Sequence, residues 1–214
     1  MNMAKIRLSK KEQRLVQNTD LILTKNQIIS KARLLLEQLQ QDFISHLKSH
    51  YQKLPAEILK PTPKISKGEN YLGLPYLILD YPRYFGKECL PKEETNIFAI
   101  RTMFWWGHFF SITLHLSGSY KKNFEHAITA FFPTLKKENY FLGINDTEWE
   151  HHFDKNNYKK INTFTKTSFK RQVIKNCFLK IAYKLPLTQW DEVNEKLFDE
   201  FKLLIELRHQ LPSR

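Results

Sequence analysis

Cysteine, glycine and catalytic motifs are all scarce in this 214-residue sequence. Its two cysteines, Cys89 and Cys177, lie far apart and form no metal-binding or redox motif, so we expect two reduced thiols. With six glycines in the whole chain, a glycine-rich phosphate-binding loop is not expected. The signatures G-x-S-x-G and H-E-x-x-H do not occur either. The sequence therefore offers no recognisable catalytic motif, and we expect no cofactor.

Long apolar runs are also missing. A transmembrane helix needs about 20 apolar residues, whereas the most apolar stretch, Phe104 to Leu116, has 13 residues and includes two histidines. The first residues, MNMAKIRLSKKEQ, are positively charged but are not followed by the apolar segment of an export signal. We therefore expect a soluble, cytoplasmic protein with no transmembrane segment.

The charge balance is strongly basic, with 34 Lys and Arg against 22 Asp and Glu, a net charge of +12. Of the basic residues 26 are Lys and 8 are Arg, although Arg is the residue that phosphates and base edges prefer. The excess of Lys, with 13 Asn and 7 Ala, also fits the codon bias of an AT-rich genome. Residues 155–184 hold nine basic residues and no acidic one. This block predicts a nucleic-acid or acidic partner, with Lys170, Arg171 and Lys175 as the contacts.

Apolar residues at steps of three and four predict a long N-terminal helix. The residues on its apolar face are Ile28, Ala32, Leu35, Leu39, Phe43 and Leu47. A T-x-x-Q capping box at Thr24 would begin this helix, and Pro55 would end it. A second capping box, Ser9 to Glu12, predicts a shorter helix before it.

The pattern changes in the middle of the chain. Residues 61–70 contain two prolines, a glycine and polar side chains, and are expected to form a loop. Tyr76 to Phe85 is β-branched and aromatic, which predicts a strand of about six residues ending at Pro82.

Residues 98–116 alternate between large apolar side chains at even positions and smaller or polar ones at odd positions. One strand of this length would span about 66 Å, so the segment must fold back, and Gly107 suits the turn. Because both arms have their apolar residues at even positions, the loop must hold an odd number of residues. We expect a hairpin at residues 97–117 with Trp105 to Gly107 as its loop. The expected pairs are Phe104–His108, Thr102–Phe110, Ile100–Ile112 and Phe98–Leu114.

Helical periods return after residue 118. The expected elements are a helix at 124–131, a strand at 139–144, a short helix at 146–153, a helix at 169–185 and a last helix from the capping box at 188–191 to about 211. Together the elements predict a single α+β domain, residues 1–214. It is mainly helical at 1–58, mainly strand at 71–118 and mainly helical at 121–214. The expected fold has a long N-terminal helix, a central antiparallel sheet that contains the hairpin, and C-terminal helices that pack on the sheet.

Two groups of residues could ligate a metal. His46 and His50 are four residues apart on the apolar face of the long helix, a spacing that can supply two ligands. Glu148 and His151 form an E-x-x-H pair, and His152 is also one turn from Glu148. Neither group contains a complete ligand set. Buried, hydrogen-bonded histidines and a solvated helix end are therefore the alternatives that we favour.

Four polar residues, Asp80, Arg83, Arg101 and His115, come from adjacent predicted strands. Arg101 points to the less apolar face of the hairpin, where a guanidinium can hold the carboxylate or phosphate of a ligand. Arg side chains in such positions more often pair with an internal acid, which Asp80 would supply.

Three hypotheses for the function follow. The protein is a binding or interaction module without catalysis, a basic nucleic-acid-associated protein, or a metal-dependent enzyme that uses His46 and His50 with a carboxylate. The missing motifs favour the first.

Overall fold

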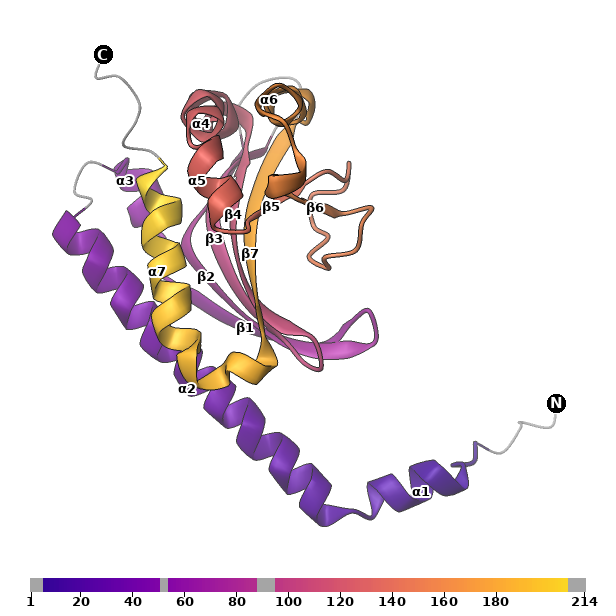
Figure 1. The fold of residues 1–214 in the computed structure, drawn as a ribbon. Helices are drawn as coiled ribbons and strands as arrows, with labels where there is room; N and C mark the ends of the chain where they lie inside the picture. Colours follow the sequence, from indigo (N-terminus) through magenta and orange to yellow (C-terminus); the bar gives the residue numbers. More distant parts are fainter. Residues whose placement is uncertain (1–5, 51–53, 88–94, 208–214) are drawn as a thin grey trace.

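The computed structural model describes residues 6–50, 54–87 and 95–207, and Cys89 lies outside these ranges. It is an α+β fold in which helices cover one face of a seven-stranded antiparallel sheet (Figure 1). The sheet order is β1-β2-β3-β4-β7-β5-β6. The long N-terminal helix, the central sheet and the C-terminal helices were all expected from the sequence, and the structure confirms them. Within the described ranges, no helix is long and apolar enough to cross a membrane.

Two helices begin the described chain. Helix α1 (Lys10–Val16) starts at the predicted capping box, in which Ser9 and Glu12 each bond the other's backbone N–H. Helix α2 (Thr19–His50) buries four residues of the predicted apolar face, Ala32, Leu39, Phe43 and Leu47. Leu36 is buried as well, although Leu35 was predicted in its place and is only half-buried. The buried residues begin only at Ala32, because the first part of α2 extends beyond the edge of the sheet (Figure 1). The short helix α3 (Ala56–Leu59) follows.

The strands are β1 (Lys64–Tyr71), β2 (Leu74–Lys87), β3 (Thr95–Trp105), β4 (Phe109–Ser117), β5 (Phe141–Gly143), β6 (Tyr158–Lys160) and β7 (Phe178–Pro186). The remaining helices are α4 (Gly118–Ala130), α5 (Phe132–Lys137), α6 (Lys166–Lys175) and α7 (Val193–Glu206). The even-numbered side chains of β3 and β4 join the main core, which includes the buried faces of α2 and α7.

The hairpin of β3 and β4 confirms the predicted parity but not the predicted register. Its loop is Trp106 to His108, so Phe104 pairs with Phe110 and Ile100 with Leu114. The loop therefore lies one residue further along the chain than expected, and each pairing shifts by two residues. Gly107 remains in the turn with a φ of +75°. The alternating pattern determines which side chains face the core. A shift of the pairing by two residues leaves the same side chains facing the core, so the pattern cannot distinguish the two registers.

Two predictions around the second strand were wrong. The segment expected to be a loop, residues 61–70, contains most of β1, which pairs with β2 along the sheet edge. Strand β2 also continues past Pro82 to Lys87. The pairing of β2 with β3 is interrupted between Asp80 and Arg83, so the missing N–H of Pro82 removes no ladder hydrogen bond.

The predicted helix at residues 169–185 was also wrong, because it is divided between α6 and β7. Strand β7 is buried on both faces, so Phe178 and Ile181 are both in the interior although they point in opposite directions. Apolar residues three and four positions apart then mimic a helical stripe. The region predicted to be mainly helical, 121–214, thus contributes β5, β6 and β7 to the sheet.

Replacing Gly107 by valine is expected to lower the free energy of unfolding by about 1–3 kcal/mol. A Cβ at this position would meet only Leu74 Cδ1, at 3.8 Å, so the cost is strain of a β-branched residue at positive φ and not a clash. Urea unfolding followed by circular dichroism measures this change. A loss below about 0.5 kcal/mol, which is ordinary for a surface substitution, would contradict the strained turn.

Candidate functional site

The candidate site lies on the sheet face opposite the helices. The strand register places Asp80 of β2 beside Arg101 of β3, and Arg101 beside Thr113 of β4. Two residues further along β4, on the same face of the sheet, His115 pairs with Lys180 of β7. Polar and charged side chains from four strands therefore share this face. The loop formed by residues 144–157, which we call the covering loop, lies over them.

Arg101 and Asp80 form a bidentate ion pair. Arg101 Nε donates to Asp80 Oδ1 at 2.8 Å, and Nη2 donates to Oδ2 at 2.9 Å. The two side chains are 18% and 10% exposed, so the pair is largely shielded from water. The predicted internal partner of Arg101 is therefore present. The pair fixes the guanidinium so that its third nitrogen, Nη1, is directed at the covering loop.

His151 of the covering loop accepts a hydrogen bond from this third nitrogen. Arg101 Nη1 lies 2.7 Å from His151 Nε2, and a guanidinium can only donate, so Nε2 carries no proton. Burial holds the pKa of His151 well below its usual value, and repulsion from Arg101 and Lys180 lowers it further. His151 is consequently a neutral imidazole that completes the hydrogen bonding of Arg101.

His115 is the most unusual group on this face. Burial, followed by the charges of Lys180 and Arg101, lowers its pKa to about 3. Its Nε2 is buried and has no hydrogen-bond partner among the described residues. The nearest carboxylate oxygen is Glu148 Oε1, at 3.9 Å, and burial raises the pKa of Glu148. A buried polar atom without a partner costs free energy, which marks this position as a candidate for ligand contact.

Lys180 supplies a second buried cation. Its side chain is fully buried, and Nζ donates to the backbone carbonyl of Glu150 at 2.5 Å. Nζ also lies 5.1 Å from the ring centre of Tyr158. Burial lowers the pKa of Lys180 to about 8, although Glu150 and Glu148 act in the opposite direction. Lys180 therefore still carries its proton at neutral pH.

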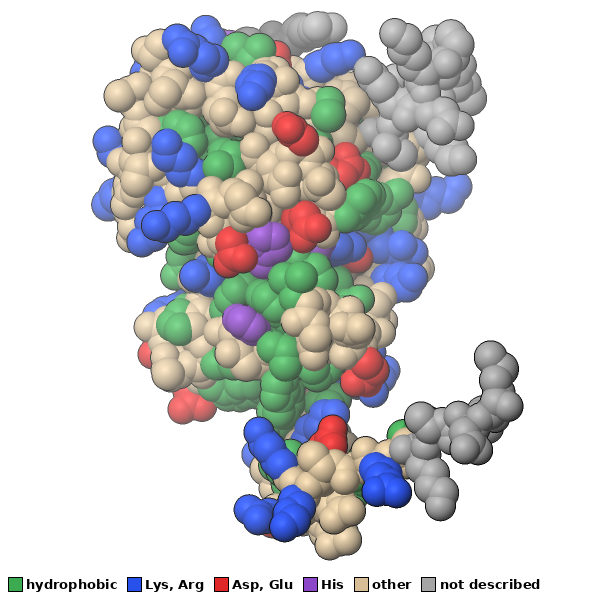
Figure 2. All heavy atoms as spheres, turned by 90° about the vertical axis from the view of Figure 1, so that its right-hand side faces the viewer, with side chains coloured by type: hydrophobic (Ala, Val, Ile, Leu, Met, Phe, Trp, Pro, Cys, Tyr) green, Lys and Arg blue, Asp and Glu red, His purple; other side chains and the backbone are tan. Residues whose placement is uncertain are grey.

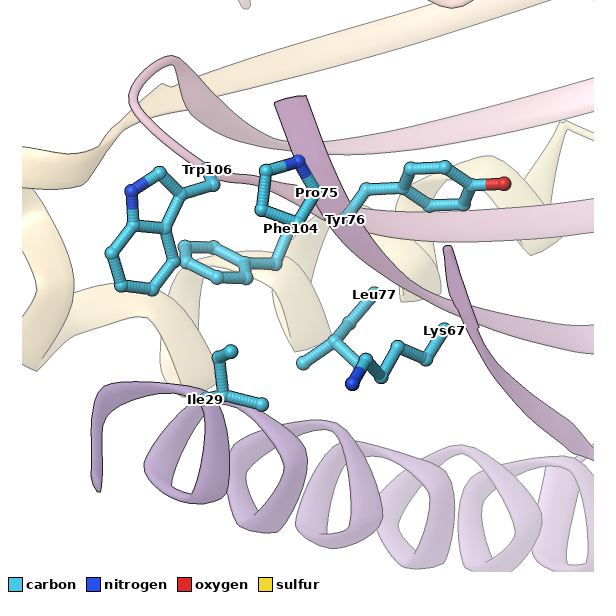
Figure 3. Close-up of a pocket in the computed structure, with 7 residues that line it drawn as sticks. All are labelled: Ile29, Lys67, Pro75, Tyr76, Leu77, Phe104 and Trp106. Carbon is cyan, nitrogen blue, oxygen red and sulfur yellow. The ribbon is translucent and has the colours of Figure 1, made fainter. Parts of the chain in front are cut away.

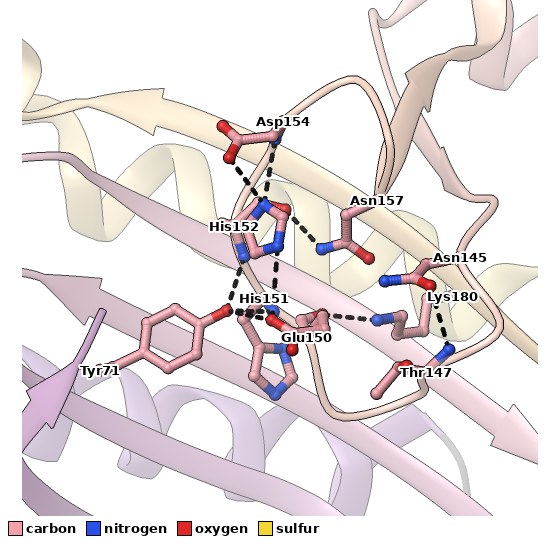
Figure 4. Close-up of polar contacts among 9 residues, drawn as sticks. All are labelled: Tyr71, Asn145, Thr147, Glu150, His151, His152, Asp154, Asn157 and Lys180. Atoms are coloured by element: carbon pink, nitrogen blue, oxygen red, sulfur yellow. Dashed lines mark hydrogen bonds and ion pairs between the residues drawn. The ribbon is translucent and has the colours of Figure 1, made fainter.

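Tyr71 of β1 holds the covering loop in place (Figure 4). Its hydroxyl accepts the backbone N–H of His151 at 2.7 Å and that of His152 at 3.0 Å, and it lies 3.3 Å from Glu150 Oε2. The two ends of the loop are joined by a hydrogen bond from the N–H of Ile144 to the carbonyl of Asn157, at 2.8 Å. Such compact loops with closed ends are frequently functional.

The covering loop contradicts the predicted short helix at 146–153, because residues 145–157, all of them described, contain no helix. Thr147 instead bonds the side chain of Asn145, and Asn157 bonds the carbonyl of His152, so local side-chain contacts replace the helical ladder. Glu148 and His151 do not share a helix face. They approach the sheet separately, which brings them to Arg101, His115 and Lys180.

The predicted metal ligands do not combine into one site. His46 and His50 lie on α2, beside the helices and not beneath the covering loop. Their rings stack at 4.6 Å, and His46 meets the edges of Phe198 and Phe201 on α7. His152 is near Glu150 and Asp154, at 3.3 and 3.2 Å. Within the described ranges, no three His, Cys, Asp or Glu side chains are grouped so that they could hold a metal ion.

The other predicted site residues also lie apart from the cluster. The strand register places Arg83 on the same sheet face as His115, but its Nε donates to the carbonyl of Thr62 at 2.8 Å. Lys170, Arg171 and Lys175 are exposed on α6. The proposed nucleic-acid contacts therefore belong to a different surface, and that hypothesis remains a prediction.

Figure 2 shows the covering-loop side of the molecule, where histidine and acidic side chains lie together above a band of hydrophobic ones. Comparisons with protein-family models, with characterised proteins and with solved structures find no significant match to this chain.

Proposed function

We propose that the protein binds a small anionic molecule, a carboxylate or a phosphate, between the covering loop and the sheet. The observation that carries this proposal is the buried Nε2 of His115, which lacks a hydrogen-bond partner among the described residues and lies close to Lys180 and Arg101. This is the binding function that the sequence favoured, now assigned to Asp80, Arg101 and His115 without Arg83.

The electrostatics of the cluster support an anion. His115 and His151 are neutral because burial and the cations Arg101 and Lys180 lower their pKa values. An oxyanion within hydrogen-bond distance of His115 Nε2 would favour the protonated imidazole and raise its pKa again. Binding therefore takes up a proton, and the unpartnered nitrogen becomes a donor. The covering loop must shift to admit the ligand, since Lys180 and Tyr71 now bond its backbone.

Isothermal titration with phosphate, acetate and citrate tests this proposal. We expect at least one anion to bind more tightly at pH 5.5 than at pH 7.5, by about tenfold, with an enthalpy that depends on the ionisation heat of the buffer because a proton is taken up. Lys180→Met should weaken binding by about tenfold or more, and His115→Gln should remove the pH dependence.

Arg83→Ala is the matched control, because Arg83 is a strand arginine outside the cluster. It should leave the affinity within about twofold of wild type. If no anion of the panel binds, or if Arg83→Ala weakens binding as much as Lys180→Met does, the site assignment is wrong.

We also propose that the protein is cytoplasmic. Cys177 is an exposed free thiol, and exposed thiols remain reduced in the cytosol. The basic surface of α6, with Lys170, Arg171 and Lys175, supports binding to nucleic acid or to another acidic partner as the alternative function.

A further inference from the structure

On the helical side of the sheet, a second surface of the molecule is not covered by any element of the described residues. Residues 6–27 comprise α1 and the start of α2, and none of them is buried. We call this segment the arm; it projects from the body in Figure 1. Seven large apolar side chains are exposed on it, namely Ile6, Leu8, Leu15, Val16, Leu21, Ile22 and Leu23. A helix as short as α1 gains little stability on its own, so the arm depends on packing that the described part of the chain does not supply.

The arm continues the buried face of α2. Counting back from Ala32 by three and four residues gives Ile28 and Ile29, then Lys25, then Leu21 and Ile22. The face that packs on the sheet thus runs on beyond the sheet edge, where Leu21 and Ile22 are 46% and 42% exposed. A helix laid along this stretch would bury both side chains.

An apolar pocket lies where the arm meets the body (Figure 3). Ile29 of α2 lines one side of it, and Tyr76 of β2 and Trp106 of the hairpin turn line the other. Lys67 of β1 stands at its edge. The pocket has room for about one water molecule, so it does not receive a side chain. Its aromatic lining instead offers a contact surface beside the exposed face of α2, against which an apolar side chain of a docked amphipathic helix can lie.

The charge of this surface determines the kind of partner. The arm carries five basic residues, Arg7, Lys10, Lys11, Arg14 and Lys25, against two acidic ones, a net charge of +3. Lys and Arg dominate the projecting segment in Figure 2. A second copy of the chain, itself at +12, would be repelled. Helices that lie on membranes usually carry aromatic residues, and residues 6–27 contain none.

We propose that the arm and the pocket at its base bind an acidic amphipathic helix of another protein, with its apolar side chains on Leu21, Ile22 and Trp106 and its carboxylates near Lys25 and the basic residues of α1. This site is separate from the proposed anion site, which lies on the opposite face of the sheet.

The probe is a fluorescent synthetic peptide of three heptads, with Leu on its apolar face and Glu at its polar positions. Fluorescence anisotropy with the full chain should show it binding at least about tenfold more tightly than the same peptide with Lys in place of Glu. The affinity should fall as salt is added. Leu21→Ser combined with Ile22→Ser should weaken binding of the Glu peptide by about tenfold or more, and Lys25→Glu should weaken it as well.

Leu23→Ser is the matched control, since Leu23 is 54% exposed in the same turn but lies about 200° around the helix from Leu21. It should change the affinity by less than about twofold. All of these positions are exposed, so circular dichroism should show that the variants fold. Equal binding of the Glu and Lys peptides, or undiminished binding by the double variant, would overturn the proposal. Two other results would do the same: association of the arm with phosphatidylserine vesicles in place of the peptide, and self-association through the arm in sedimentation experiments.

Discussion

Arg101→Ala is expected to lower the free energy of unfolding by about 3–5 kcal/mol. The substitution removes both hydrogen bonds to the carboxylate of Asp80, whose side chain is only 10% exposed, and leaves it buried without its cation. It also removes the donor to His151 Nε2, so the covering loop loses a contact with the sheet. Denaturant unfolding followed by circular dichroism measures the loss.

Two further variants identify the cause. Arg83→Ala removes an arginine whose Nε donates to the backbone carbonyl of Thr62, and should cost less than about 1 kcal/mol. Asp80→Asn in the Arg101→Ala background should recover part of the loss, because it removes the uncompensated charge. A single Arg101→Ala variant as stable as Arg83→Ala would show that the ion pair contributes nothing to the fold.

The contribution of His115 to stability is expected to fall as the pH drops below about 6.5, in a chloride buffer without an oxyanion, whereas Glu200, whose pKa burial raises to about 7, acts in the opposite direction. His115 has a pKa of about 3 in the folded protein and about 6.5 when unfolded. Between these values the unfolded chain binds a proton that the folded chain does not, so acid favours unfolding by about 1.4 kcal/mol per pH unit. From pH 6.5 to 4.5 this amounts to about 2 kcal/mol for His115 alone. His151, whose pKa is also lowered, acts in the same direction.

His115→Gln should reduce the slope of unfolding free energy against pH between 5 and 6.5, by about 1 kcal/mol per unit. Carboxylates with ordinary pKa values do not titrate in this range, and the opposing effect of Glu200 is present in both proteins, so the difference between the two slopes reports His115. Identical slopes in wild type and in His115→Gln would mean that the pKa of His115 is not lowered in the folded state.

The sequence predicted those parts of the fold in which one face is buried and the other is not. Helix α2 and the hairpin of β3 and β4 both have such a face, so their periods of 3.6 and 2 are visible along the chain. Strand β7 is buried on both faces, and β1 is an exposed edge strand with few apolar residues. Neither strand therefore shows the alternation of apolar and polar residues that marks a strand. The residues of β1 were predicted to be a loop, and those of β7 were predicted to be part of a helix.

The site was predictable in part for a similar reason. The parity of the hairpin placed Arg101 and His115 on one face, and the adjacent strand supplied Asp80. Glu148 and His151 were selected for a helical spacing that the structure does not contain, and they reach the cluster through tertiary contacts alone. The helix predicted at 169–185 gave no reason to place Lys180 on a sheet face. In a strand, its position between Leu179 and Ile181 points it to the opposite face from these two apolar residues.

The position of β7 in the sheet affects the order in which the strands can pair during folding. It is the last strand in the chain, yet it lies between β4 and β5. While the ribosome is still making residues before Phe178, strands β1 to β4 can form a meander whose open edge is β4, and every residue of β4 is buried in the finished protein. An unpaired edge of this kind readily recruits other chains. Arrival of residues 178–186 closes that edge and at the same time provides the strand on which β5 pairs. Because β4 and β7 are far apart in sequence, their pairing raises the contact order of the fold, which favours slow folding. Slow folding prolongs the period in which the unpaired edge of a nascent chain can associate with other chains.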